Sequence, residues 1–304
     1  MKQSLLIFFK KMLQVQCLLL VTSASFANSV ACFNSNMGAF CIELFESHTP
    51  ITTANFLTYI NNGSYTNGVF HRSEPGFVIQ GGKYRVVTNA GQKSLVGVTK
   101  LPAIQNEFKI HNTRGTVAMA KIPGDANSAS SEWFVNLTDN SANLDVQNGG
   151  FTVFGRVIFD GMAVFDSIGK LARSADNFPL VPPVPPQPTF DNVVSISDVT
   201  VTNPTGVFHE NIASFAVDIG DGTVAEVKLK LVNSDADLLF ELDPESIKIL
   251  PAKPANVATF LPQSGEVTIP GLLINQTTMA NNIRMELVNT QPYQFVLKSY
   301  ELSN

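Results

Sequence analysis

Charged residues are scarce in this sequence, and the residues of the commonest catalytic sites are scarcer still. Only 15% of the 304 residues are charged, the formal net charge is −5, and no basic run could follow a nucleic-acid backbone. The four histidines show no metal-ligand spacing, and no serine lies in a Gly-x-Ser-x-Gly motif. We therefore expect no nucleic-acid partner, no metal and no cofactor, and neither a hydrolase nor a metalloenzyme.

The N-terminal segment has the order of a secretory signal peptide. Three lysines among the first eleven residues precede a mostly apolar stretch, and Ser25-Phe26-Ala27 is small at both recognition positions. This order predicts cleavage near Ala27 and a periplasmic or secreted protein whose mature chain does not span a membrane. Two alternatives remain open. One is a membrane anchor, although the apolar stretch is shorter than the roughly 20 residues of a spanning helix. The other is a lipoprotein cleaved before Cys32.

Two of the three cysteines, Cys32 and Cys41, remain after such cleavage. If residues 31–44 form a hairpin that turns at Asn36-Met37, these two cysteines lie opposite each other on paired strands. A disulfide can then form in an oxidising compartment. Two free thiols in the core are the alternative.

The pattern along the chain favours strands over helices. Thr49 as N-cap, Pro50 at the first helical position and the stop signal at 61–63 predict one helix. A second helix is predicted at 161–172, with Asp160 as its N-cap. Residues 64–158 are mostly short apolar runs separated by Gly, Asn, Asp and Ser, as in a barrel or sandwich. Residues 177–190 contain six prolines and favour polyproline II. Beyond residue 204, alternating runs predict a small, sandwich-like all-β domain.

One stretch, FHRSEPGFVIQGG at residues 70–82, places a guanidinium and a carboxamide among apolar, strand-like residues. Such a pair suits a reaction in which no bond between heavy atoms is made or broken. Rotation about an X-Pro peptide bond is one, with a barrier of roughly 18 to 20 kcal/mol because the amide is resonance-stabilised. A guanidinium that donates to the pyramidal prolyl nitrogen would stabilise the twisted state selectively.

These residues resemble the signature of the cyclophilins. GTVAMA at 115–120 and SEWFVN at 131–136 resemble the second signature of that family, and TPITTANFLTYI at 49–60 and VFGRVIFDGMAVFDSI at 153–168 are similar to family segments in the same order. The resemblance runs from about Val30 to Val201. It implies a peptidyl-prolyl cis-trans isomerase with a closed antiparallel β-barrel and two capping helices.

The resemblance also sets the expected domains, because family members end in a strand similar to residues 192–201. We expect a signal peptide at 1–27, an isomerase domain at 28–203 that includes the proline-rich loop 177–190, and an all-β domain at 204–304. The C-terminal domain carries no readable motif.

Roles for ten residues follow from the resemblance. Arg72 resembles the catalytic arginine, and Gln80 resembles the glutamine that holds substrate backbone or a bound water. The substrate-binding positions comprise the walls of the proline pocket, the groove edge before the proline and two positions where this chain departs from its relatives. They are Phe77, Val78, Phe134 and Leu144 in the walls, Ala120 and Lys121 at the edge, and Phe151 and Glu132.

Some departures from the family pattern affect the expected activity. Val78 replaces the usual methionine. Glu132 replaces the usual glutamine, and its carboxylate could pair with Arg72 and slow catalysis. Asn143 stands where relatives carry a tryptophan or phenylalanine that shapes cyclosporin binding, so we expect weak inhibition by that drug. A titration that gives nanomolar inhibition would contradict this expectation.

Pleat counting predicts which side chains share a face. A two-residue turn at Pro75-Gly76 would place Arg72 on the face of Ile79 and turn Gln80 away. For both to reach one groove, the strand would have to bend or bulge near the turn. On strand 132–136, alternation places Glu132 with Phe134 and turns Trp133 into the core.

Two functions are consistent with these patterns. The first is an isomerase, a monomer, that acts on proline-containing, partly folded exported proteins. The second is a binding module or chaperone that keeps the groove with little turnover. A client-binding role and a spacer role are equally compatible with the C-terminal domain.

Overall fold

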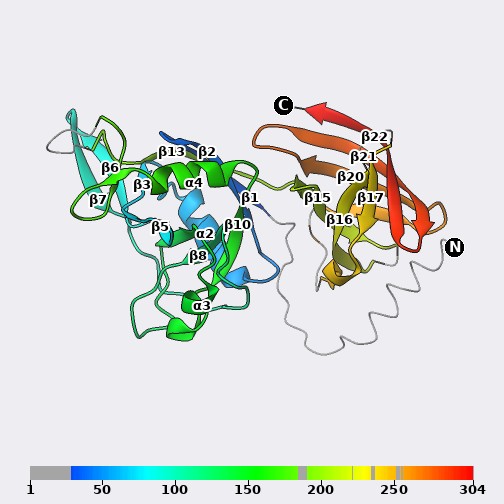
Figure 1. Ribbon diagram of the computed structural model, residues 1–304, viewed down its shortest axis with the longest axis horizontal. Helices are drawn as coiled ribbons and strands as arrows, with labels where there is room; N and C mark the ends of the chain where they lie inside the picture. The colour runs from blue at the N-terminus through cyan, green and yellow to red at the C-terminus, as the bar shows by residue number, and fades with distance from the viewer. Residues whose placement is uncertain are drawn as a thin grey trace. The chain divides into compact units, whose positions relative to one another are not determined.

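The computed structural model describes residues 29–183, 190–220, 222–233, 237–250, 254 and 256–303. One compact unit comprises Val30–Thr202, and a second comprises the described residues from Asn203 onward together with Ser29 (Figure 1). The predicted signal peptide lies outside the described residues. Within the described ranges, no helix has the length and apolar character needed to cross a membrane.

The N-terminal unit is built on one eight-stranded antiparallel sheet. Its strand order is β13 (Ile196–Thr202), β1 (Val30–Ser35), β2 (Gly38–Leu44), β10 (Val153–Ile158), β8 (Thr116–Met119), β9 (Trp133–Asn136), β5 (Val78–Gly81) and β4 (Arg72–Glu74). Near the two ends of this order, Val69 in β3 (Gly68–Val69) bridges to Ser195, and the Phe70 N–H donates to the Val194 carbonyl at 3.0 Å. The predicted mainly β, barrel-like fold is confirmed, with closure that is only approximate.

The core of this unit is aromatic and centres on Trp133. Phe56 of α2 (Pro50–Asn61) and Phe165 of α4 (Gly161–Gly169) are both fully buried in the same cluster. The Phe56 and Trp133 rings meet edge to face, with centroids 5.8 Å apart, a favourable aromatic geometry. The predicted inward orientation of Trp133 and the two predicted helices are confirmed, and a short α3 (Ser141–Leu144) is added.

Helix α2 begins at Pro50 as predicted, but its N-terminal amides are capped by a residue distant in sequence. The Thr49 side chain makes no cap bond. Instead, the Glu107 carboxylate accepts from the backbone N–H groups of Ile51 at 3.3 Å and Thr52 at 2.8 Å, across 55 residues in the latter case. These N–H groups have no partner inside the helix, and the positive end of the helix dipole favours an anion there.

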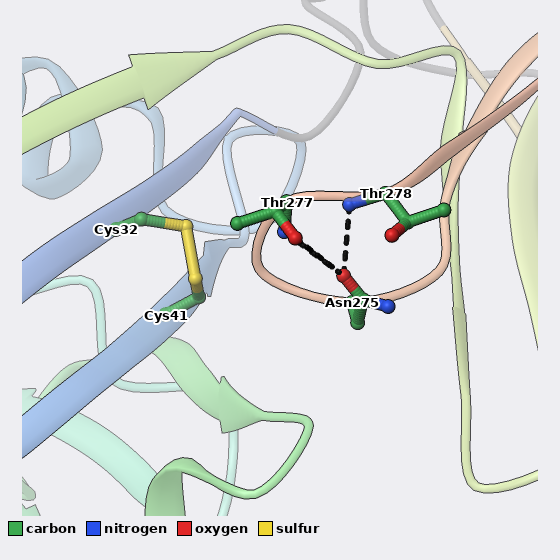
Figure 2. The surroundings of a disulfide bond; sticks show 5 residues. All are labelled: Cys32, Cys41, Asn275, Thr277 and Thr278. Atoms are coloured by element: carbon green, nitrogen blue, oxygen red, sulfur yellow. Dashed lines mark hydrogen bonds between the residues drawn. A yellow bond between two sulfur atoms is a disulfide. The ribbon is translucent and has the colours of Figure 1, made fainter. Parts of the chain in front are cut away.

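The first hairpin has the predicted register. Cys32 pairs with Cys41 across β1 and β2, and the chain turns between Ser35 and Gly38. The two sulfur atoms form a disulfide, with 4.0 Å between the Cα atoms (Figure 2). The structure therefore contains the predicted disulfide.

Two small sheets flank the main one. The hairpin of β6 (Tyr84–Asn89) and β7 (Gln92–Gly97) pairs with β3, and β11 (Ala172–Arg173) pairs with β12 (Pro179–Leu180). The polyproline II prediction is wrong at the start of the proline-rich loop, because Pro179–Leu180 is a paired strand and buried Leu180 packs with Val69. Residues 184–189 of this loop lie outside the described residues.

The C-terminal unit is all-β, as predicted. Among its described residues, the strands are β14 (Gly206–His209), β15 (Ile212–Asp218), β16 (Val224–Asn233), β17 (Leu239–Leu242), β18 (Lys248–Ile249), β19 (Ala258–Leu261), β20 (Glu266–Leu273), β21 (Met279–Thr290) and β22 (Tyr293–Ser303). The pairing runs from β15 through β19, β20, β21, β22, β17 and β16 and returns to β15, so one sheet closes on itself around the core in place of two facing sheets. Between β20 and β21, the Asn275 Oδ1 accepts from the Thr277 and Thr278 N–H groups (Figure 2).

Candidate active site

The hairpin that carries Arg72 and Gln80 turns over three residues, Pro75, Gly76 and Phe77. Arg72 pairs directly with Gln80 in an unbroken register, and the Phe77 N–H donates to the Glu74 carbonyl at 2.9 Å. The predicted two-residue turn is wrong by one loop residue. Because directly opposed residues share a face, this shift brings Arg72 and Gln80 to the same side without the expected bulge.

This face continues across the sheet as an apolar surface. Gln80 opposes Phe134 on β9, Phe134 opposes Ala118 on β8, and Ala118 opposes Val153 on β10. The neighbouring positions Ile79, Val117 and Val135 point the other way, into the main core. Strand alternation therefore separates the candidate site from the core.

Six of the predicted substrate-binding residues gather in one apolar cluster on this face. Val78, Phe134 and Leu144 are buried there, and Phe77, Ala120 and Phe151 pack against them. The Phe134 and Phe151 rings meet edge to face with centroids 5.9 Å apart. Four further residues belong to the cluster and were not predicted from the sequence: Ala118, Val153, Phe45 and Ile110. Alternation along β8 and β10 could have identified Ala118 and Val153.

A line of polar contacts borders the apolar cluster. The Arg72 Nη1 donates to the Gln80 Oε1 at 3.4 Å, and the Gln80 Nε2 donates to the Glu132 Oε2 at 2.9 Å. The same Glu132 oxygen lies 3.4 Å from the His71 Nε2, and the other lies 3.5 Å from the Lys100 Nζ. Glu132 therefore belongs to the site through Gln80.

The acid that pairs with Arg72 is Glu74. The Arg72 Nε donates to the Glu74 Oε1 at 3.3 Å, and the Arg173 Nη1 lies 3.5 Å from the other Glu74 oxygen. The predicted pairing of Arg72 with Glu132 is wrong, because the carboxylate of Glu132 is engaged by Gln80, His71 and Lys100. The Arg72 side chain is 42% exposed, so its guanidinium is accessible beside the cluster.

The environment of Glu132 keeps its carboxylate ionised. Burial by itself raises the pKa of this carboxyl, but the hydrogen bond and charge of His71, the charge of Lys100 and the hydrogen bond from Gln80 together lower the pKa below its ordinary value. At neutral pH, Glu132 is consequently a pure hydrogen-bond acceptor.

Lys121 supports the loop that carries Phe151. Its Nζ donates to the carbonyl oxygens of Asn148 at 2.7 Å and Gly150 at 2.6 Å and lies 4.6 Å from the centre of the Phe151 ring. Burial lowers the pKa of this amine. Ala120, which precedes Lys121, is held beside the start of β9, since its N–H donates at 2.9 Å to the carbonyl of Glu132, the residue before that strand.

Gly82 sets the spacing between β5 and the segment before β9. Its φ is +84°, and a Cβ atom there would lie 2.2 Å from the Ser131 carbonyl oxygen and 2.9 Å from the Trp133 Cδ1. Only glycine allows this approach. The second glycine of the QGG sequence therefore keeps Gln80 within reach of Glu132.

The site offers hydrogen-bond donors beside apolar surface. In the part of the chain that the structure describes, no group of three or more His, Cys, Asp or Glu side chains could hold a metal ion. A guanidinium next to an apolar cluster can donate a hydrogen bond to a peptide amide while the cluster contacts an apolar side chain of the same peptide. This combination suits rotation about an X-Pro bond.

Comparison with known proteins places this arrangement in a family. The family described as cyclophilin type peptidyl-prolyl cis-trans isomerase/CLD matches residues 30–185. A peptidyl-prolyl cis-trans isomerase of Acinetobacter baylyi is 37% identical over 157 residues, which cover 51% of this chain and 80% of that protein. Peptidyl-prolyl cis-trans isomerase B of Escherichia coli is 39% identical over 146 residues, covering 46% and 84%. A Cryptosporidium parvum cyclophilin type isomerase, crystallised in the presence of the dipeptide Ala-Pro, aligns over 57% of this chain and 98% of its own, at 22% identity and a TM-score of 0.43.

The N-terminal unit is thus a cyclophilin domain. The chain belongs to the family of cyclophilin-type peptidyl-prolyl cis-trans isomerases and is an isomerase of X-Pro peptide bonds. The relatives do not favour the alternative of a binding module with little turnover. The family match ends at residue 185, before the C-terminal unit begins.

Proposed function

We propose that Arg72 is the catalytic group of this isomerase and that Gln80 holds it and the substrate backbone in place. The observation that carries the proposal is the direct pairing of Arg72 with Gln80 on the face that also presents the apolar cluster. Both polar side chains thereby border a surface that can receive a proline ring.

The chemistry requires selective binding of a twisted amide. In the planar amide, the prolyl nitrogen shares its electron pair with the carbonyl and accepts no hydrogen bond. As the bond rotates, resonance is lost, the nitrogen becomes pyramidal and its lone pair becomes an acceptor. A hydrogen bond from Arg72 that exists only in this state lowers the barrier without tightening substrate binding.

The apolar residues supply substrate binding in this proposal. Phe77, Val78, Phe134 and Leu144 would surround the proline ring, and Phe151 would close one side. Ala120 and Lys121 would contact the residue before the proline. The ammonium group of Lys121 is held by carbonyl oxygens of the 148–150 loop, so its contribution to the groove edge comes from its alkyl stem.

A proline-peptide isomerisation assay tests the assignment of Arg72. We expect Arg72→Ala in the mature chain to lower kcat/KM about 100-fold, comparable with removal of one donor to a transition-state charge. Arg284→Ala is the matched control, since Arg284 is an exposed arginine of the C-terminal unit. Equal rates for Arg72→Ala and the control would reject the assignment.

We further propose that the clients are exported, partly folded proteins and that the mature chain works as a monomer in the periplasm or outside the cell. The signal-like sequence at 1–27 and the Cys32–Cys41 disulfide, which needs an oxidising compartment, support this location. Mass spectrometry of the protein recovered from fractionated cells would test it. An uncleaved N-terminus in the cytoplasmic fraction would contradict it.

A chaperone role for the C-terminal unit is a separate proposal. Its test compares the full mature chain with residues 28–203 as suppressors of the aggregation of an unfolded protein. A gain from residues 204–304 would support client binding by this unit, and equal suppression would support a spacer. Weak inhibition by cyclosporin also stays a prediction, with Asn143 exposed on α3.

A further inference from the structure

The side-chain amide of Gln80 connects the carboxylate of Glu132 with the guanidinium of Arg72. The carboxylate accepts from the Gln80 Nε2 at 2.9 Å, while the Gln80 Oε1 accepts from the Arg72 Nη1 at 3.4 Å. The amide of Gln80 therefore lies between an acid and a guanidinium. Its two ends differ in hydrogen-bonding character, so its orientation decides what faces Arg72.

We propose that Glu132 is a positioning residue that fixes the side-chain amide of Gln80 with its oxygen toward Arg72. This inference rests on the proposed catalytic role of Arg72. It gives the carboxylate at position 132 a supporting role in catalysis, opposite to the inhibitory one expected from the sequence.

Hydrogen-bond donors and acceptors match in only one orientation of the Gln80 amide. An ionised carboxylate only accepts, and a guanidinium only donates. In the observed orientation, Gln80 offers N–H to Glu132 and oxygen to Arg72. With the amide turned by 180°, an oxygen would face the carboxylate and an NH₂ group would face the guanidinium, so both contacts would become repulsive. A neutral side chain at position 132 would impose this choice less strongly.

The surroundings of Glu132 hold it in this role. The charged or titratable groups that face it are His71, 3.4 Å from one oxygen, and Lys100, 3.5 Å from the other. The ring of His71 is itself buried and packs edge to face on Tyr84, with centroids 5.7 Å apart. The side chain of Glu132 is only 20% exposed, so water competes weakly for its oxygens.

The consequence for Arg72 is that its guanidinium has two fixed acceptors, Gln80 on Nη1 and Glu74 on Nε. These bonds orient the planar group before the substrate arrives. A donor that is already oriented stabilises the transition state without further reorganisation. Loss of Glu132 should therefore reduce kcat and leave KM nearly unchanged.

A double-mutant cycle on kcat and KM tests the proposal in the full mature chain with a proline peptide. We expect Glu132→Leu to lower kcat about threefold to tenfold, the rate equivalent of one hydrogen bond. We expect no further loss when Glu132→Leu is added to Gln80→Ala. Glu132→Gln keeps an oxygen that can accept from Gln80 and should stay within about twofold of the wild type. Asp198→Leu, an exposed acid on β13, is the matched control.

The outcomes separate this proposal from the one on which it rests. Losses that multiply in the double variant, or a Glu132→Leu rate equal to or above wild type, would overturn the role of Glu132 while Arg72→Ala still loses activity. A fully active Arg72→Ala would overturn both proposals. An NMR titration of the wild type with acid tests the same contact without the leucine variant, which could misfold. The side-chain NH₂ resonances of Gln80, assigned by their absence in Gln80→Ala, should shift as Glu132 is protonated. Resonances that do not move would overturn the proposal.

Discussion

Gly82→Ala should destabilise the N-terminal unit far more than the same change at Gly76. Both glycines have positive φ, +84° at Gly82 and +72° at Gly76. An alanine at either position therefore costs about 1 to 2 kcal/mol for the left-handed backbone. At Gly76, nothing lies within 4 Å of the added Cβ, whereas at Gly82 the Cβ would lie 2.2 Å from the Ser131 carbonyl oxygen.

The steric clash of the added Cβ at Gly82 cannot be relieved by the movement of a flexible side chain. The clashing atom belongs to the backbone, and a further contact, at 2.9 Å, is to the buried Trp133 ring. Strand β5 and the segment before β9 must separate, and the packing of Trp133 is disturbed with them. We expect a total loss of about 3 to 5 kcal/mol, as for other disruptive core changes.

Tryptophan fluorescence during urea unfolding is the assay for this pair. Trp133 is the only tryptophan of the chain and lies in the core of the N-terminal unit, so its signal reports that unit alone. Gly76→Ala is the matched control, since it measures the loss of unfolding free energy that comes from the positive φ alone. Equal losses of unfolding free energy in the two variants, or a loss at Gly82 of 1 kcal/mol or less, would refute the steric argument.

Three further predictions concern the same unit and use the same fluorescence assay. The pair of changes Cys32→Ser and Cys41→Ser should lower the unfolding free energy by about 2 to 3 kcal/mol, because the disulfide restricts the unfolded chain; an unchanged midpoint would contradict this. Glu107→Ala should cost about 1 kcal/mol, since it removes the acceptor for the first amides of α2, and Glu107→Gln should cost less. The pKa of Glu132 is lower in the folded protein than its ordinary value, so ionised Glu132 stabilises the fold above that ordinary value, and the contribution is lost as the pH falls through the folded pKa. The stability difference between wild type and Glu132→Gln should therefore shrink in acid, and a difference independent of pH would contradict the assignment.

Local patterns in the sequence predicted much of the N-terminal unit. The symmetric spacing of Cys32 and Cys41 about a short turn gave the hairpin register, and strand alternation placed Trp133 in the main core and Phe134 on the opposite face of the sheet. The direct pairing of Arg72 with Gln80 was not predicted, because one extra loop residue reverses the face of a whole strand. The apolar pattern of the two strands does not determine how many residues the loop between them contains.

Contacts between distant segments were beyond sequence reasoning. Glu107 caps α2 from outside the helix, and Glu132 binds Gln80 although its likeness to a family position suggested contact with Arg72. In the C-terminal unit, alternation predicted strands but not that β15 pairs with both β16 and β19 to close one sheet. Such closure depends on the summed twist and stagger of all strands.

The most direct test of the central claim separates binding from rotation at Arg72. NMR exchange spectroscopy on a proline-containing peptide measures both its dissociation constant and the cis-trans rate on the enzyme. Arg72→Lys keeps the positive charge but lacks the planar fork of donors. For Arg72→Lys we expect a dissociation constant within about threefold of wild type and an on-enzyme rate reduced at least about tenfold. An unchanged rate, or a loss explained wholly by weaker binding, would contradict it.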